Sequence, residues 1–116
     1  MSKAPEIIIV GRGIAELTLA LALFEVGIRA RVFESASESR ELGVGINVLP
    51  HATKEFERLG ILNRLTNSGL ELERYIWFNR FGQEIFSEAR GLRAGYEWPQ
   101  VAIHRGIFHR ILFDTV

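Results

Sequence analysis

Apolar runs separated by short polar or glycine-containing breaks dominate the first third of this chain. Residues 6–10 contain four consecutive β-branched residues and stop at Gly11, residues 14–26 follow with an apolar helical pattern, and residues 30–34 are typical of a second strand. Strand, tight turn, helix and strand in this order predict a right-handed βαβ unit. Four consecutive apolar residues favour burial of the first strand on both faces, and the nearly all-apolar helix is predicted to be interior.

The remaining pattern predicts further short elements around a β-hairpin. Aromatic and β-branched residues on either side of Asn79-Arg80-Phe81-Gly82 indicate the hairpin, with Gly82 as the left-handed turn residue. Its Tyr, Trp and Phe stripe is more typical of a core than of a substrate pocket. The other expected elements are a glycine-containing strand at 42–48, helices from Pro50 to about residue 59 and from 62 to about 68, a strand at 100–103 and a final helix from 104.

The glycine turn between the first strand and helix is the first candidate for chemistry. Gly11 permits a sharp turn, and Gly13 lets the backbone approach a ligand because no β-carbon intervenes. The start of a helix offers unpaired N–H groups and about half a positive charge, so it attracts phosphate. Glu34 ends the second strand about 20 residues further on, where a carboxylate can bind the hydroxyls of an adenosine ribose. Together these features predict a dinucleotide site.

Composition narrows the classes of partner. In 116 residues, 14 basic and 14 acidic side chains cancel, without a basic cluster, so we expect no nucleic-acid or anionic-membrane partner. The chain has no Cys and only three scattered His, which argues against a metal site. Arg12, Glu16 and Glu25 interrupt the apolar stretch after residue 6, so we expect neither a membrane span nor a signal peptide, and a cytoplasmic location.

Several motifs, in this order and spacing, resemble the N-terminal part of the FAD-dependent aromatic monooxygenases, the group of para-hydroxybenzoate and salicylate hydroxylases. They are Gly11-x-Gly13-Ile14-Ala15, Phe33-Glu34-Ser35, Leu42-Gly43-Val44-Gly45-Ile46-Asn47, Leu59-Gly60-Ile61, Pro99-Gln100 and Ile103-His104-Arg105-Gly106. The resemblance implies an α/β fold, a Rossmann-like FAD-binding half-domain with a projecting hairpin from an incomplete substrate domain. It implies an FAD-binding segment at 1–70, the hairpin at 71–99 and a return to the FAD-binding part at 100–116.

The same resemblance implies roles for individual residues. The turn of Gly11, Gly13 and Ile14 would hold the FAD diphosphate, Glu34 the adenosine ribose, and Arg105 the phosphate and ribityl region. Arg40, Gly45 and Ile46 would lie beside the flavin. Such enzymes use NAD(P)H to reduce FAD and O₂ to hydroxylate an aromatic ring, and no catalytic side chain is assigned in this chain.

Glu16 stands where the dinucleotide fingerprint has its third glycine, and its carboxylate should repel the diphosphate. We therefore expect weak FAD binding and no hydroxylase activity from this chain alone. The sequence leaves three interpretations: the FAD-binding portion of a flavin monooxygenase, a non-catalytic remnant or partner-completed module without flavin, and an NAD-binding Rossmann unit. The last leaves the motifs at 43–47 and 103–105 unexplained. The exposed hairpin face also predicts self-association.

Overall fold

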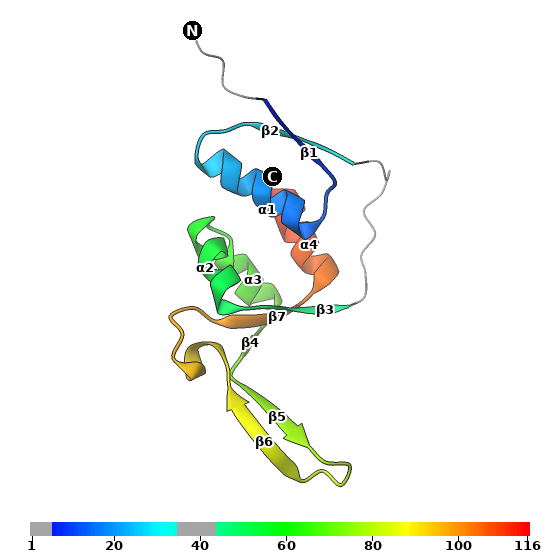
Figure 1. Ribbon diagram of the computed structural model, residues 1–116, viewed down its shortest axis with the longest axis vertical. Coiled ribbons are helices and arrows are strands. Elements are labelled where there is room, and N and C mark those ends of the chain that lie inside the picture. The colour runs from blue at the N-terminus through cyan, green and yellow to red at the C-terminus, as the bar shows by residue number, and fades with distance from the viewer. Residues whose placement is uncertain (1–5, 35–43) are drawn as a thin grey trace. The chain divides into compact units, whose positions relative to one another are not determined.

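The computed structural model describes residues 6–34 and 44–116 and is an α/β chain, as the sequence predicts. It divides into two compact units (Figure 1). The first, here the glycine-turn unit, comprises Met1–Val44 and His104–Val116; the second, the hairpin unit, comprises Gly45–Ile103. The boundaries at residues 70 and 99 that the resemblance implies stay predictions.

The glycine-turn unit contains the predicted βαβ unit. Strand β1 (Ile7–Val10) pairs in parallel with β2 (Ala30–Phe33), and helix α1 (Ile14–Glu25) connects them. Gly27, with φ +82°, takes the left-handed position after the helix. Helix α4 (Arg105–Thr115) packs against α1. The core they share is made of Leu17, Leu21, Phe108, Ile111 and Leu112.

Two expectations about burial in this unit are wrong. Ile9 is buried, but Ile8 and Val10 are 59% and 76% exposed, so β1 is not buried on both faces. Because side chains alternate along a strand, these two point away from the face that α1 covers. Likewise α1 is not interior all round, since Phe24 near its end is 76% exposed.

The hairpin unit is built on a three-stranded sheet with the order β3-β7-β4. Strands β3 (Gly45–Val48) and β7 (Gln100–His104) were predicted, whereas β4 (Leu70–Leu72), antiparallel to β7, was not. A β-carbon on Gly69 would stand 2.7 Å from the Ala102 carbonyl oxygen, so only glycine lets β4 enter this close to β7.

Helices α2 (Pro50–Arg58) and α3 (Leu62–Ser68) form as predicted, with Pro50 in the first turn of α2. The Thr53 side chain is fully buried, and its hydroxyl lies 2.8 Å from the Pro99 carbonyl oxygen, which ties α2 to the start of β7. The core of this unit is made of Val48, Phe56, Ile61, Leu65, Val101 and Ile103.

The predicted hairpin consists of β5 (Arg74–Phe78) and β6 (Glu84–Ala89), and Figure 1 shows it extending away from the three-stranded sheet. Gly82 has φ +81°, as the turn requires, and a short 3₁₀ helix, η1 (Gly91–Ala94), follows β6. Trp77, Phe78 and Phe86 are 44%, 57% and 56% exposed, so the aromatic stripe is not core, whereas the prediction of an exposed apolar face on the hairpin is confirmed. A two-stranded hairpin has no second layer to bury its side chains.

Among residues 6–34 and 44–116, no helix is both long and apolar enough to cross a membrane.

Candidate functional site

The glycine turn has the backbone geometry of an anion cradle. Gly11 has φ +111°, in the left-handed region, and its N–H donates to the Phe33 carbonyl at the end of β2. Gly13 is the N-cap of α1, and its carbonyl accepts from the Leu17 N–H at 3.0 Å, so the helix starts directly at Ile14. Gly13 has no side chain to cap the first helical turn, so the first N–H groups of α1 are left for other acceptors.

Glu34 reaches the glycine turn from the end of β2. Its Oε2 accepts a hydrogen bond of 2.9 Å from the backbone N–H of Arg12, between the two glycines. The side chain is exposed, so the carboxylate also faces solvent. The parallel pairing of β1 with β2 brings both strand ends to the same edge, which is why residues 22 apart in sequence meet there. The structure thus places the two predicted parts of the dinucleotide site side by side.

Glu16 occupies space over the same turn. A β-carbon added to Gly13 would stand 2.7 Å from Glu16 Oε2, and one added to Gly11 would stand 3.0 Å from Oε1. The side chain therefore folds back over both glycines. The start of α1 is the positive end of the helix dipole, so it attracts the Glu16 carboxylate just as it would attract a phosphate. The Glu16 carboxylate therefore occupies the position that an anionic ligand would need.

Helix α4 braces the turn from the C-terminal part of the chain. His109 Nε2 contacts the carbonyl oxygen of Arg12, across 97 residues of sequence. The Arg12 guanidinium lies 5.5 Å from the centre of the Phe113 ring, and His109 stacks on that ring. The turn is thus held by β2 on one side and by α4 on the other.

The remaining predicted site residues lie in both units. Ile14 opens α1, and Arg105 opens α4 with a half-buried side chain; the Arg105 N–H donates to the Val44 carbonyl at 2.8 Å. Gly45 and Ile46 are the first two residues of β3, in the hairpin unit. Arg40 lies outside the described residues. Within the described ranges, no group of three or more His, Cys, Asp and Glu side chains could hold a metal.

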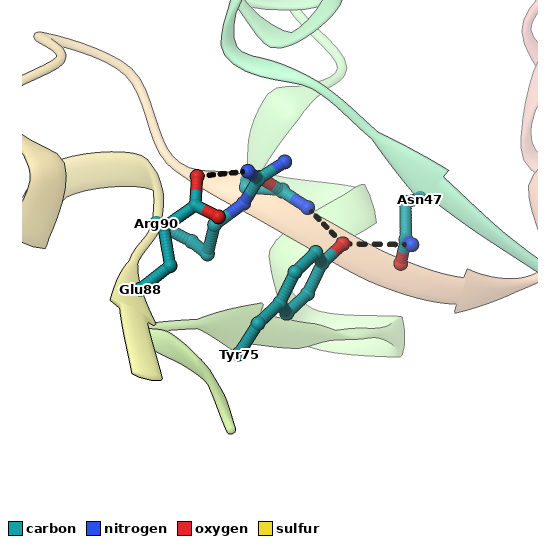
Figure 2. A network of polar contacts seen from close by, with 5 residues as sticks. Asn47, Tyr75, Glu88 and Arg90 are labelled. Atoms are coloured by element: carbon teal, nitrogen blue, oxygen red, sulfur yellow. Dashed lines mark hydrogen bonds and ion pairs between the residues drawn. The ribbon is translucent and has the colours of Figure 1, made fainter. Parts of the chain in front are cut away.

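Sequence reasoning missed a polar network at the base of the hairpin, shown in Figure 2. The Tyr75 hydroxyl oxygen accepts from Asn47 Nδ2 at 3.0 Å and from Gln100 Nε2 at 2.7 Å. Arg90 donates from Nε to Gln100 Oε1 at 3.0 Å, pairs with Glu88 at 2.9 Å, and lies over the Tyr75 ring. The partners of Tyr75 lie 28 and 25 residues away in sequence, so no local pattern signals the network.

Comparisons with known proteins identify the relatives of the chain. It is 43% identical over 112 residues to the phenazine 1,6-dicarboxylic acid hydroxylase PhzS of Lysobacter antibioticus, covering 96% of this chain and 28% of that protein. It is 34% identical over 112 residues to 3-hydroxybenzoate 6-hydroxylase 1 of Aquipseudomonas alcaligenes, with coverage of 94% and 28%. No protein-family model matches.

The fold has relatives among solved structures as well. Klebsiella pneumoniae HpxO, crystallised with FAD and uric acid, superimposes with a TM-score of 0.79 at 26% identity, covering 94% of this chain and 28% of HpxO. The Rossmann-type fold predicted for the FAD-binding part is confirmed by such neighbours. The chain spans about 28% of the length of the curated relatives it matches. Over that part of their length, the chain is a homologue of the FAD-dependent aromatic monooxygenases, as its motifs predict.

Proposed function

We propose that this chain is the FAD-binding portion of a flavin-dependent monooxygenase that hydroxylates an aromatic substrate with NAD(P)H and O₂. The observation that carries the proposal is the hydrogen bond from the Arg12 N–H to the Glu34 carboxylate. It supports a site in which one edge of the β1-β2 sheet offers backbone N–H groups for phosphate and an acid for ribose. The homologous hydroxylases supply the reaction class.

Several parts of FAD have a candidate contact in the chain. The diphosphate would bind over Gly11 and Gly13 at the start of α1, and Glu34 would accept hydrogen bonds from the adenosine ribose. Arg105 would neutralise phosphate charge. Gly45 and Ile46 of β3, together with Arg40, would lie beside the flavin ring. The bound flavin supplies the redox chemistry with NAD(P)H and O₂, while this chain binds and orients it.

The cradle fits a diphosphate only when the Glu16 side chain leaves it. A carboxylate and a phosphate at about 5 Å, with an effective dielectric constant near 20, repel by roughly 3 kcal/mol. The side chain extends over both glycines, so it must rotate toward solvent before a ligand can approach the turn. We therefore infer weak FAD binding by this chain on its own.

The position of Glu16 also favours a second candidate function. A chain whose own acid lies over its helix start already places a negative charge at the positive end of the helix, as expected of a non-catalytic or partner-completed module without flavin. The two candidates differ in one property: only the first requires that the turn accept a nucleotide diphosphate when Glu16 is neutralised.

Calorimetric titration with ADP, the adenine half of FAD, tests the proposal. In the Glu16→Gln background, we expect Glu34→Gln to weaken ADP binding by about tenfold, because a hydrogen bond to a charged group contributes about 1.5–3 kcal/mol and glutamine keeps part of it. Glu6→Gln is the matched control, since Glu6 is an exposed acid paired with Arg31 at the opposite end of the same strands. Equal loss in both variants would contradict the site.

Arg105 offers an independent test of the same proposal. Arg105→Ala should weaken FAD or ADP binding by about 1.5–3 kcal/mol, the contribution of a hydrogen bond to a charged group. Arg110→Ala, an exposed arginine of the same helix, controls for net charge. A dissociation constant that Arg105→Ala leaves unchanged would remove Arg105 from the site.

A further inference from the structure

Within the described residues, β5 and β6 pair only with each other, so each strand of the hairpin has an outer edge without a strand partner. At one end of their ladder, the Arg90 N–H donates to the Glu73 carbonyl at 2.8 Å, and at the other end the Asn79 N–H donates to a carbonyl of β6's flank at 2.9 Å. Hydrogen-bonded and non-hydrogen-bonded pairs alternate along an antiparallel ladder, so these bonds fix which residues point their backbone groups outward. On β5 these residues are Arg74, Ile76 and Phe78.

The two outer edges of the hairpin are not alike. Strand β6 carries the acids Glu84 and Glu88, and the ladder shifts register after Trp77, which leaves Ile85 of β6 without an opposite residue. Charged side chains and bulges are the devices by which natural sheets block an edge against further pairing. Strand β5 has no acid and no extra residue, and Arg74 is its single charged residue. The β5 edge is therefore the one that is open to another strand.

Strand β5 is complementary to itself when two copies lie antiparallel with Ile76 opposite Ile76. All of the outward-pointing N–H and C=O groups of β5 then face a partner. Arg74 lies opposite Phe78 of the second copy, which places a cation beside an aromatic ring. Tyr75 lies opposite Trp77 of the second copy, and these two rings already share one face of β5, with centres 5.9 Å apart. Cross-strand aromatic pairs stabilise a sheet, and no like charges meet in this register.

The neighbouring registers are less favourable. Sliding one copy by two residues in one direction places Arg74 opposite Arg80, so like charges oppose each other at both ends. Sliding it in the other direction places Glu73 opposite Trp77 and leaves outward-pointing backbone groups of β5 without a partner. The register centred on Ile76 is thus the one that uses the whole open edge.

We propose that β5 is an interface for a second copy of this chain, and that the two hairpins form one antiparallel sheet with Ile76 at the two-fold axis. A two-stranded hairpin is marginally stable, whereas a sheet of three or more strands with an apolar face is stable in water. Pairing of identical antiparallel strands is isologous, so it closes at a dimer. The acids of β6 lie on the outer edges of the joint sheet. The interface lies within the hairpin unit and does not depend on the proposed FAD cradle.

Cysteine crosslinking of the full chain tests the register directly, because the chain has no Cys of its own. Residues opposite each other in a hydrogen-bonded antiparallel pair have Cα atoms about 5.5 Å apart, within the range of a disulfide. Under mild oxidation, Ile76→Cys should therefore form disulfide-linked dimers. Phe78→Cys on β5 and Ser87→Cys on β6 are the matched controls, since each would lie about 14 Å from its copy in this arrangement. We expect Ile76→Cys to crosslink at least about tenfold faster than either control.

A pair of lysine substitutions tests the same interface without a covalent bond. Ile76→Lys places two ammonium groups opposite each other across the axis, and like charges in that position destabilise a sheet. Ile85→Lys makes the same change at a 67% exposed position of β6 and is the matched control. In sedimentation equilibrium, the dissociation constant of the dimer should rise by at least about tenfold in Ile76→Lys and stay within about twofold in Ile85→Lys. Cooperative urea unfolding of both variants checks that each still folds.

Three results would overturn the β5 interface. Equal crosslinking of all three cysteine variants, or none at Ile76→Cys, would mean that the strands do not meet in this register. Faster crosslinking of Ser87→Cys would mean that copies pair through β6. Equal dissociation constants for Ile76→Lys and Ile85→Lys would mean that the hairpin associates through general apolar contact or does not associate. None of these outcomes bears on ADP binding at the glycine turn, which tests the proposed function separately.

Discussion

The Glu16 carboxylate and Gly13 share one small space: a β-carbon on Gly13 would stand 2.7 Å from Glu16 Oε2. The acid thus lies over the backbone that the proposed diphosphate would contact. An acid in the first turn stabilises a helix by about 0.3–1 kcal/mol, whereas its repulsion of a phosphate at about 5 Å is roughly 3 kcal/mol. The Glu16 side chain therefore stabilises the folded chain slightly and weakens binding of a phosphate ligand much more.

Neutralising Glu16 should change binding and stability in opposite directions. Glu16→Gln is expected to raise affinity for ADP by about ten- to hundredfold, since most of the roughly 3 kcal/mol repulsion disappears. The free energy of unfolding should fall by about 0.3–1 kcal/mol, because the helix dipole loses its acid. Calorimetry and urea unfolding measure the two effects. Glu57→Gln on α2, an exposed acid of the other unit, should change neither. Unchanged ADP affinity in Glu16→Gln would refute this electrostatic account.

His109 is expected to support the glycine turn from α4. His109→Leu removes the contact with the Arg12 carbonyl, so the free energy of unfolding should fall by about 0.5–1.5 kcal/mol, the usual worth of one hydrogen bond. His51→Leu, at an exposed position of α2, is the control for loss of an imidazole. If both substitutions have the same effect in urea unfolding, the bracing role of His109 is incorrect.

Tyr75→Phe should destabilise the hairpin unit. Removing the hydroxyl leaves the buried Gln100 amide without that acceptor, and an unsatisfied buried polar group costs about 1–3 kcal/mol. Amide hydrogen exchange should accelerate along β5 and β6. Tyr96→Phe, in the exposed segment after η1, removes the same group from a tyrosine outside the network and should have little effect. Unaltered hairpin exchange in Tyr75→Phe would show that the network does not hold the hairpin.

The exposed hairpin should make the chain self-associate. Trp77 and Phe86 pack against each other with ring centres 5.3 Å apart, and both remain about half exposed. Burial of this pair against a second copy would stabilise an assembly. Light scattering should give a mass above the 13.2 kDa of one chain, and Trp77→Thr with Phe86→Thr should lower it. A monodisperse monomer with cooperative melting would contradict this prediction.

Local patterns were sufficient for the elements that carry the candidate cradle. Gly11, Gly13 and Glu34 were predicted because a strand, a turn and a helix each have a local signature, and parallel pairing then brings the strand ends together. Strand β4 was missed because its three residues, with a charged Glu71 in the middle, are too few to show a period. The Tyr75 network was missed because its partners meet only after the sheet and hairpin have formed.

Burial was predicted less well than secondary structure, for a physical reason. The apolar runs of β1, α1 and the hairpin are typical of elements that pack against other elements on both sides. Apolar sequence alone does not say whether the described residues supply those neighbouring elements. Val10, Phe24 and Phe86 are therefore apolar as a core requires, and exposed in this structure. The position of Glu16 was anticipated from its place in the first helical turn, but its reach over both glycines was visible only in the structure.

The most direct test of the central claim is the ADP affinity of Glu16→Gln compared with Glu16→Gln combined with Glu34→Gln. If the glycine turn and Glu34 form an FAD cradle, the single variant binds ADP measurably, and the second substitution weakens binding by about tenfold. If the single variant binds no ADP at millimolar concentration, or if both variants bind equally well, the turn is not the cradle that we propose.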